Sequence, residues 1–183
     1  MEITEISSER IKDIKGINEP FEIIGKLKPA FVNDEWSFTE ELFADSYMHS
    51  YEEDDTDYSE FVDNPYKTVF MAYVDGKFAG RIIVRKDWNK YVFVDDISVL
   101  QDFRGKGIGT ALMQRAVEWA KKEEMAGLAL ETQDNNLLAC RFYSRFGFKL
   151  GAVNTMFYKN LDKPFCDATA LYWYMVFDTD NRD

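Results

Sequence analysis

The stretch from residue 91 to residue 132 constrains the fold more than any other part of the sequence. A β-rich run, YVFVDDISVL at 91–100, leads into the glycine-rich loop FRGKGIGTAL at 103–112. Helical spacing of apolar residues follows up to about residue 124, and a second β-rich run, GLALET, lies at 127–132. Two strands joined through one helix form a crossover whose strands are parallel. The sequence therefore predicts an α/β fold with a parallel pair of strands.

Two helices are predicted from the spacing of apolar residues. The first should bury one face, made of Ile108, Leu112, Ala116 and Trp119. The second lies within QDNNLLACRFYSRFGF at 133–148, with Asp134 or Asn135 as its N-cap and Gly147 as its C-terminal stop. Its expected apolar face consists of Leu138, Phe142 and Phe146.

Further strands are predicted on either side of this unit. Residues 21–32 (FEIIGKLKPAFV) are expected to form a first strand. Residues 69–88 contain two β-rich runs joined through Asp75-Gly76, which is a strong hairpin signal. Residues 153–177 are expected to form two more strands joined by a turn-rich connection.

The segment at 38–62 mixes aromatic and acidic residues. We expect one or two helices here, broken by the acidic run Glu52–Asp57, which is more typical of a solvated loop than of a ligand site. The sequence contains no repeat and no interdomain linker, and its length of 183 residues suits one domain. We therefore expect a single domain over 1–183.

Composition excludes several functional classes. The formal net charge of −11 disfavours nucleic acid as a partner and favours a cationic one, although excess acid can serve solubility alone. No apolar run approaches the roughly 18 residues of a membrane span, and residues 1–16 lack the apolar stretch of a signal peptide. A cytoplasmic protein with no membrane association is expected.

Metal and thiol chemistry are also disfavoured. Cys140, Cys166 and the single His49 supply neither a disulfide framework nor a metal-ligand cluster, so no metal is expected. Cys140 is expected to pack in a helix rather than act as a nucleophile.

The glycine-rich loop predicts an anion site. Gly105, Gly107 and Gly109 are spaced G-x-G-x-G, which fits neither the dinucleotide fingerprint nor the Walker loop. Backbone N–H groups at a helix N-terminus, beside Arg104 and Lys106, nevertheless suit a phosphate. The alternative is a tight turn that binds nothing.

Two motifs together resemble those of the GNAT-type N-acetyltransferases. They are the loop Arg104-x-x-Gly107-x-Gly109 and the helix signature Asn136-x-x-Ala139-x-x-Phe142-Tyr143-x-x-x-Gly147-Phe148. This resemblance implies a mixed, mostly antiparallel sheet flanked by helices, with a central parallel pair splayed for acetyl-CoA, and a cofactor-binding core at about 67–160. In this family the loop holds the cofactor pyrophosphate.

The same resemblance implies a set of cofactor contacts. The backbone at 97–99 would pair with the pantetheine arm, Asn136 would hydrogen-bond it, and Tyr143 would face the thioester sulfur. The complete set of implied acetyl-CoA contacts is Ile97, Ser98, Val99, Arg104, Gly105, Lys106, Gly107, Ile108, Gly109, Thr110, Asn136, Ala139 and Tyr143.

Longer segments look like the streptothricin acetyltransferases within that family. They are KDWNKYVFVDDISV, DFRGKGIGTAL, LALETQDNNLLACRFYSRFGFKLG and ALYWY. This resemblance implies direct acetyl transfer in a ternary complex to an amine of the β-lysine moiety of streptothricin, conferring antibiotic resistance. GNAT-like enzymes often pair through C-terminal strands, so a homodimer is possible.

The chemistry requires a group that removes a proton. An amine with a pKa of about 10 is protonated at neutral pH. Asp95 and Asp96 should point to opposite faces of their strand. Resemblance to the strand acid of some aminoglycoside-acetylating relatives favours Asp95 as the base, with Asp96 as the alternative. Either carboxylate could instead hold the substrate ammonium or a structural partner.

Tyr143 is expected to protonate the departing thiolate, and core packing is its alternative role. Aromatic side chains that could contact a cationic substrate are Trp36, Tyr47, Tyr51 and those of Tyr172–Tyr174. Other functions remain open: a protein or peptide N-terminal acetyltransferase, a polyamine acetyltransferase, or a non-catalytic acyl-CoA-binding regulator.

Overall fold

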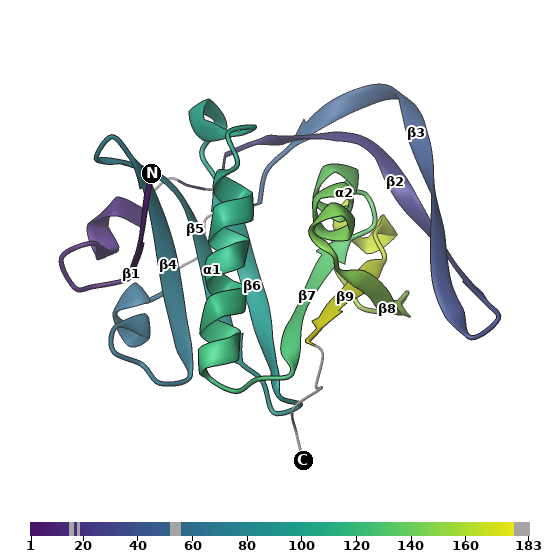
Figure 1. The fold of residues 1–183 in the computed structure, drawn as a ribbon. Coiled ribbons are helices and arrows are strands. Elements are labelled where there is room, and N and C mark those ends of the chain that lie inside the picture. Colours follow the sequence, from purple (N-terminus) through teal and green to yellow (C-terminus); the bar gives the residue numbers. More distant parts are fainter. Residues whose placement is uncertain (15–16, 18, 52–55, 178–183) are drawn as a thin grey trace, which may run out of the picture. The chain divides into compact units, whose positions relative to one another are not determined.

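The structure is a computed structural model that describes residues 1–14, 17, 19–51 and 56–177 (Figure 1). Its strands are β1 (Glu2–Glu5), β2 (Phe21–Val32), β3 (Glu35–His49), β4 (Lys67–Val74), β5 (Lys77–Lys86), β6 (Tyr91–Val99), β7 (Gly127–Gln133), β8 (Lys149–Asn154) and β9 (Ala170–Val176). Its helices are α1 (Ile108–Lys122) and α2 (Leu137–Phe146), with short 3-10 helices η1 (Ile11–Ile14), η2 (Tyr58–Phe61), η3 (Gln101–Phe103) and η4 (Phe165–Asp167).

The strand order of the larger sheet is β1-β4-β5-β6-β7-β9-β8, and β2 pairs with β3 in a second sheet. In this order β6 and β7 are neighbours in a mixed sheet, and α1 connects them along the chain. The predicted fold class, with its parallel pair β6–β7, is therefore confirmed.

The chain forms two compact units: unit 1 is Met1–Glu19, Ser50–Leu128 and Val176–Asp183, and unit 2 is Pro20–His49 and Ala129–Met175. Whether residues 1–183 act as one domain stays a prediction.

In unit 1, α1 covers one face of the antiparallel strands β4, β5 and β6 (Figure 1). The predicted face of α1 is confirmed, because Ile108, Leu112, Ala116 and Trp119 are all buried. The ring of Trp119 lies edge-on to that of Phe70 in β4, with centroids 6.4 Å apart. The predicted β4–β5 hairpin is also present, and Asp75 and Gly76 have the positive φ angles of its two-residue turn.

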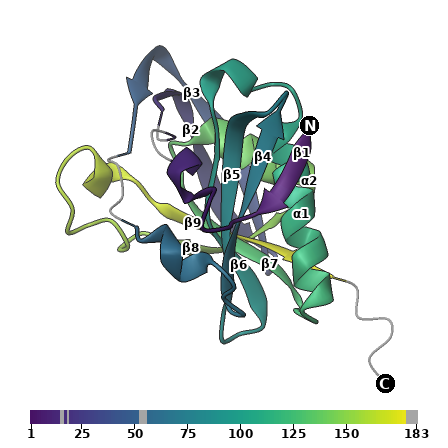
Figure 2. The same cartoon turned by 90° about the vertical axis from the view of Figure 1, so that its left-hand side faces the viewer.

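The other face of β4 and β5 carries η1 and η2, which Figure 2 shows on the side away from α1. Ile14 of η1 and Phe61 of η2 belong to one buried cluster with Val69, Met71 and Ile83. Burial and a 2.8 Å hydrogen bond donated to Asp13 raise the pKa of Tyr73 to about 12, so this phenol stays protonated and fastens η1 to β4. The acidic run lies mostly outside the described residues, since residues 52–55 are not part of them.

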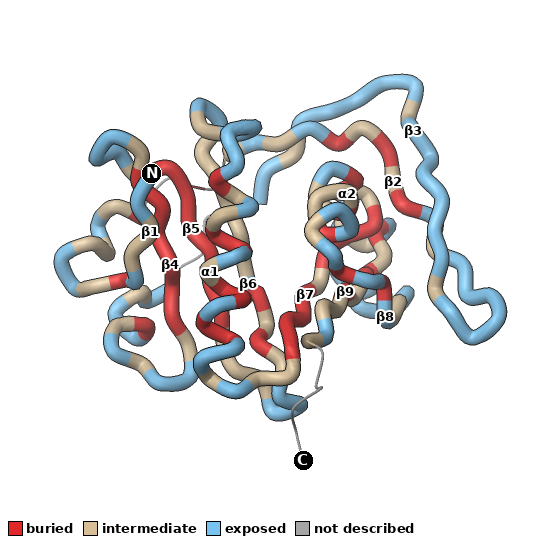
Figure 3. Tube along the Cα trace, in the orientation of Figure 1, coloured by how far each residue is buried: buried red, intermediate tan, exposed pale blue. Residues whose placement is uncertain are grey.

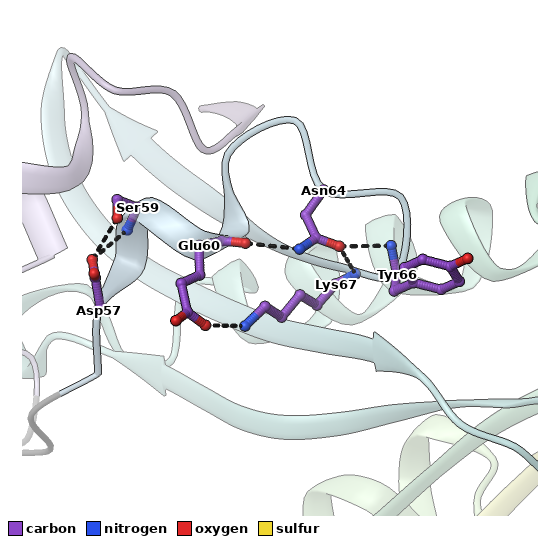
Figure 4. Close-up of polar contacts among 6 residues, drawn as sticks. All are labelled: Asp57, Ser59, Glu60, Asn64, Tyr66 and Lys67. Carbon is purple, nitrogen blue, oxygen red and sulfur yellow. Dashed lines mark hydrogen bonds and ion pairs between the residues drawn. The ribbon is translucent and has the colours of Figure 1, made fainter.

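Polar contacts fasten η2 to the start of β4 (Figure 4). Asp57 caps η2 by accepting hydrogen bonds from the backbone N–H and hydroxyl of Ser59. Lys67 forms a 2.6 Å ion pair with Glu60. Asn64 donates to the carbonyl of Glu60 and accepts from the backbone N–H of Tyr66. Residues that follow the acidic run are thereby fixed to the sheet.

In unit 2, the part of the helix prediction that covers residues 38–49 is wrong, whereas the end of the predicted segment 38–62 contains the short 3-10 helix η2 of unit 1. Residues 35–49 form β3, which pairs with the correctly predicted β2 along a long hairpin. Asn33 and Asp34 form the two-residue turn with φ angles of 52° and 62°, which the strand twist favours. Trp36 lies opposite Phe31 in the register, and their ring centroids are 5.0 Å apart, so this pair packs across the two strands. Figure 3 shows β3 exposed along most of its length.

The second predicted helix exists, but its cap and buried face differ from those expected. Asn136 is the N-cap of α2 and accepts from the backbone N–H of Ala139 at 3.2 Å. Asp134 instead accepts from the backbone N–H of Thr169, ahead of β9. The buried residues of α2 are Leu137, Cys140 and Tyr143, whereas Leu138 is 43% exposed. Gly147 ends the helix with a φ of 112°, as predicted.

The β2–β3 hairpin is attached to the start of α2. The backbone N–H of Leu27 donates to the carbonyl of Asp134 at 2.8 Å, and Gly25 forms an isolated bridge with Asn136. Arg141 of α2 pairs with Glu40 of β3, with Nε 2.9 Å from Oε1. The hairpin therefore has a defined position on the helix that carries the second sequence motif.

Candidate functional site

The glycine-rich loop forms an exposed helix entry in unit 1. Gly105 and Gly107 have φ angles of 73° and 80°, and Gly107 is the N-cap of α1. Within the described residues, no side chain caps this helix and its first turn contains no acid. The first N–H groups of a helix lack intrahelical acceptors, and together with the helix dipole they favour an anion.

Arg104 and Lys106 have defined positions in this loop. Arg104 donates from Nε to the carbonyl of Val99 at 2.9 Å and lies 3.7 Å from Glu19. Lys106 donates to the carbonyl of Asp102 at 2.8 Å. Both residues are exposed and bring positive charge to the helix entry. The loop residues therefore fit the pyrophosphate-binding role that the sequence implied, which stays a prediction at residue level.

Gly107→Ala should weaken binding of acetyl-CoA by about 10-fold, because a Cβ at a φ of 80° costs about 1–2 kcal/mol. A Cβ here would meet no atom within 4 Å, so the effect would come from the backbone and not from a clash. Titration of CoA by calorimetry would measure it. Gly76→Ala is the matched control, since Gly76 has a φ of 75° in the β4–β5 turn. Equal Kd values for all three proteins would contradict the prediction.

The prediction that Asp95 and Asp96 point to opposite faces is wrong. Ile83 pairs with Asp96 and Val84 with Val94, so β6 has an extra residue at Asp95, which is a β-bulge. Asp96 accepts from Nε of Arg81 at 3.1 Å, and Asp95 accepts from Nε of Arg85 at 3.0 Å. Because these arginines are four residues apart on β5, both carboxylates lie on the face away from α1.

The two aspartates are therefore ion-paired. Burial raises the pKa of Asp95, and the nearby Arg85 opposes this effect. Asp96 also accepts from the hydroxyl of Ser98, at 3.1 and 3.0 Å. Their predicted roles as base or substrate ligand stay predictions, but each already holds a structural partner.

The predicted residues of α2 lie in unit 2. Tyr143 is buried, and its ring packs edge-on against Phe142 and Phe148 at 5.5 and 6.0 Å. Asn136 and Ala139 stand at the first turn of the same helix. One helix thus carries Asn136 as its N-cap, Ala139 in its first turn and Tyr143 in its second.

The aromatic side chains predicted to contact substrate do not form one group. Trp36 and Tyr47 lie near opposite ends of β3, about 36 Å apart along an extended strand. Trp36 packs on Phe31 at 5.0 Å, whereas Tyr47 and Tyr51 are 43% and 42% exposed. In β9, Trp173 is fully buried against Phe38, and Tyr172 and Tyr174 are half-buried.

The structure adds a carboxylate that the sequence prediction missed. Glu131 lies in β7, and its two carboxylate oxygens accept from the hydroxyl of Tyr158 at 2.9 and 2.8 Å. Burial raises the pKa of Glu131 to about 7, against the lowering effect of Tyr158. Strongly shifted carboxyl groups are typical of functional sites. The available signal was an acid within the otherwise apolar strand GLALET.

Aromatic rings lie near this carboxyl group. Phe157 packs against Tyr158 at 4.9 Å and against Tyr172 at 6.3 Å. The charge of Glu131 contributes to the raised pKa of Tyr172, after burial. We call Glu131, Phe157, Tyr158 and Tyr172 the Glu131 cluster. A carboxylate among aromatic faces can attract a cation and accept a proton from it.

Cys140 and His49 both lie in packed surroundings. Burial raises the pKa of the Cys140 thiol to about 12, consistent with a packing role. His49 packs between Phe21 and Phe165, and burial lowers its pKa. No cluster of potential metal ligands occurs in the described part of the chain. In those same ranges, no helix is long and apolar enough to cross a membrane.

Comparison with known proteins identifies the family. Residues 29–148 match the Acetyltransferase (GNAT) family. Streptothricin acetyltransferase A of Bacillus subtilis (strain 168) is 43% identical over 175 residues, covering 96% of this chain and 99% of that protein. Streptothricin acetyltransferase of Escherichia coli is 35% identical over 57% of this chain and 60% of that protein.

Solved structures agree with this assignment. A candidate streptothricin acetyltransferase of Bacillus anthracis (strain Ames), in complex with acetyl coenzyme A, has a TM-score of 0.89 and 32% identity, covering 96% of this chain and 99% of that one. A nourseothricin acetyltransferase has a TM-score of 0.79 and 26% identity, covering 96% and 97%. The chain therefore belongs to the Acetyltransferase (GNAT) family and is an N-acetyltransferase that uses acetyl-CoA as its cosubstrate.

Proposed function

We propose that this enzyme transfers the acetyl group of acetyl-CoA to an amine of streptothricin, in its β-lysine moiety, and so inactivates the antibiotic. The Glu131 cluster is the observation that carries the proposal, because it combines a half-buried carboxyl group of raised pKa with aromatic faces. Near-complete coverage of a streptothricin acetyltransferase at 43% identity supports the same substrate. The net charge of −11 suits a polycationic substrate and disfavours nucleic acid.

The proposed mechanism assigns cofactor binding and proton transfer to separate sets of residues. The loop from Arg104 to Thr110 binds the pyrophosphate, and the backbone at 97–99 together with Asn136 holds the pantetheine arm. Bound acetyl-CoA supplies the activated acyl group. Glu131 attracts the substrate ammonium and takes its proton, which leaves the neutral amine free to attack the thioester carbonyl. Tyr143 donates a proton to the departing sulfur and regains one from the newly acylated nitrogen, which produces CoA thiol and a neutral amide. Glu131 then releases the ammonium proton to solvent.

Glu131 is favoured over Asp95 as the proton acceptor for an electrostatic reason. A base works best when its pKa lies near the operating pH, and the pKa of Glu131 is raised to about 7. Asp95 is held by the guanidinium of Arg85, which stabilises its ionised form. Trp36, Tyr47, Tyr51 and the Asp96 carboxylate stay candidates for further substrate contacts, as do a homodimer and a cytoplasmic location.

Release of CoA from acetyl-CoA should be rapid with streptothricin and slow with other candidate substrates. The assay would compare streptothricin, other aminoglycosides, polyamines and N-terminal peptides at equal concentration, with mass spectrometry of the product. A single added acetyl group on the β-lysine moiety is the expected result. Turnover of peptides or polyamines alone would replace this proposal with the alternative acetyltransferase functions. CoA binding without turnover of any amine would indicate a non-catalytic regulator.

A further inference from the structure

Arg81 is a buried cation on β5. Its side chain is 3% exposed, which is exceptional for a charged residue and costly unless the charge is paired. Nε donates to Asp96, and Nη1 donates to the hydroxyl of Tyr58 in η2. The guanidinium also lies 5.1 Å from the centre of the Tyr58 ring. We call Tyr58, Arg81, Asp96 and Ser98 the Arg81 network.

This network lies beside the bulge of β6. Asp96 follows the extra residue Asp95, and Ser98, whose hydroxyl donates to Asp96, lies opposite Arg81 in the register. A bulge interrupts the ladder and bends the strand, so side chains must fix its geometry. Arg81 fixes this geometry from the neighbouring strand β5, because it holds the carboxylate of Asp96, one residue beyond the bulge at Asp95.

The backbone of β6 after the bulge lies close to the backbone of β5. A Cβ on Gly80 would lie 2.6 Å from the carbonyl oxygen of Ser98, so β5 and β6 approach closely at this point. At the end of β6, the carbonyl of Val99 accepts from Arg104. Residues 97–99 are thus fixed by the Arg81 network on one side and by the glycine-rich loop on the other.

We propose that Arg81 is a positioning residue for acetyl-CoA binding. It holds Asp96, and through it the shape of the bulge, so that the backbone at 97–99 meets the pantetheine arm. Tyr58 completes the arrangement by accepting from Arg81, which makes cofactor binding depend on the docking of η2. The inference rests on the cofactor role of β6 in the proposed function, and not on streptothricin as substrate.

Two conservative variants test this inference. Tyr58→Phe removes the hydroxyl that accepts from Arg81 and keeps the ring. Arg81→Lys keeps the charge but cannot serve Asp96 and Tyr58 with the fixed two-armed geometry of a guanidinium. Each should raise the Kd for CoA and the KM for acetyl-CoA by about 5- to 10-fold, with kcat within about 2-fold of wild type.

Glu60→Gln is the matched control, because Glu60 also fastens η2 to β4 through Lys67 but does not touch β6 (Figure 4). Its Kd for CoA should stay within about 2-fold of wild type even where its Tm falls. Calorimetric titration of CoA without any amine provides the main measurement, and thermal unfolding accompanies it.

Three results would overturn the inference: an unchanged Kd in Tyr58→Phe, an equal rise in Glu60→Gln, or a fall in kcat at constant KM. If Arg81→Lys does not fold, Tyr58→Phe decides the question alone. Failure of the wild-type protein to bind CoA would instead contradict the proposed function, so the two failures are distinguishable.

Discussion

Replacing Glu131 by glutamine should lower kcat for acetyl transfer by about 100- to 1000-fold, the usual contribution of a general base. Glutamine retains the size of the side chain but cannot accept the proton of the substrate ammonium. The Kd for CoA should be unchanged, because CoA binding is assigned to other residues. Stopped-flow measurement of CoA release with saturating acetyl-CoA would give kcat. Glu123→Gln, which loses only an ion pair with Lys86, is the control and should keep full activity.

The pH dependence gives this experiment a second readout. Glu131 accepts a proton only when ionised, so kcat in the wild type should rise with pH through about 7, the pKa set by burial. The pKa of Glu131 in the folded protein lies above its value of 4.5 in the unfolded chain. The contribution of Glu131 to the free energy of unfolding is therefore fully present below pH 4.5 and is lost as the pH rises toward 7. In Glu131→Gln both trends should disappear. An unchanged acidic limb would assign proton acceptance to another group, with Asp95 the first candidate.

Tyr143→Phe should lower kcat and kcat/KM together by about 100-fold, because a proton donor to the leaving group acts only in the transition state. The variant keeps the ring and its contacts with Phe142 and Phe148, so its unfolding free energy should change little. Tyr66→Phe, at a tyrosine that is 70% exposed, controls for loss of a phenol elsewhere. Full activity of Tyr143→Phe would leave Tyr143 with the packing role that its burial already provides.

Local signals predicted much of the fold. The β4–β5 hairpin depends on Asp75-Gly76, and the end of α2 depends on Gly147, so each is encoded within a few residues. The helix predicted at 38–62 failed because the Asn33-Asp34 turn went unnoticed and the pairing of Trp36 with Phe31 was not considered.

Features that depend on tertiary contacts could not be predicted from local sequence signals. Strict alternation placed Asp95 and Asp96 on opposite faces, and one bulge cancelled that prediction. Glu131 went unnoticed because its hydroxyl partner, Tyr158, is 27 residues away and its burial depends on the packed fold. The glycine-rich loop was predictable since its φ angles and its helix entry are local properties.

The hydrogen bond between Tyr158 and Glu131 has a consequence for product release. An arriving ammonium ion must compete with the phenol for the carboxylate, and its full charge favours it in that competition. Acetylation converts the ammonium into a neutral amide. The product therefore lacks the charge that attracted the substrate to Glu131. Once Glu131 has released the transferred proton to solvent, Tyr158 can recover its place on the carboxylate and displace the product. Under this scheme the enzyme resists inhibition by its own product, so that acetylated antibiotic can accumulate without slowing further inactivation.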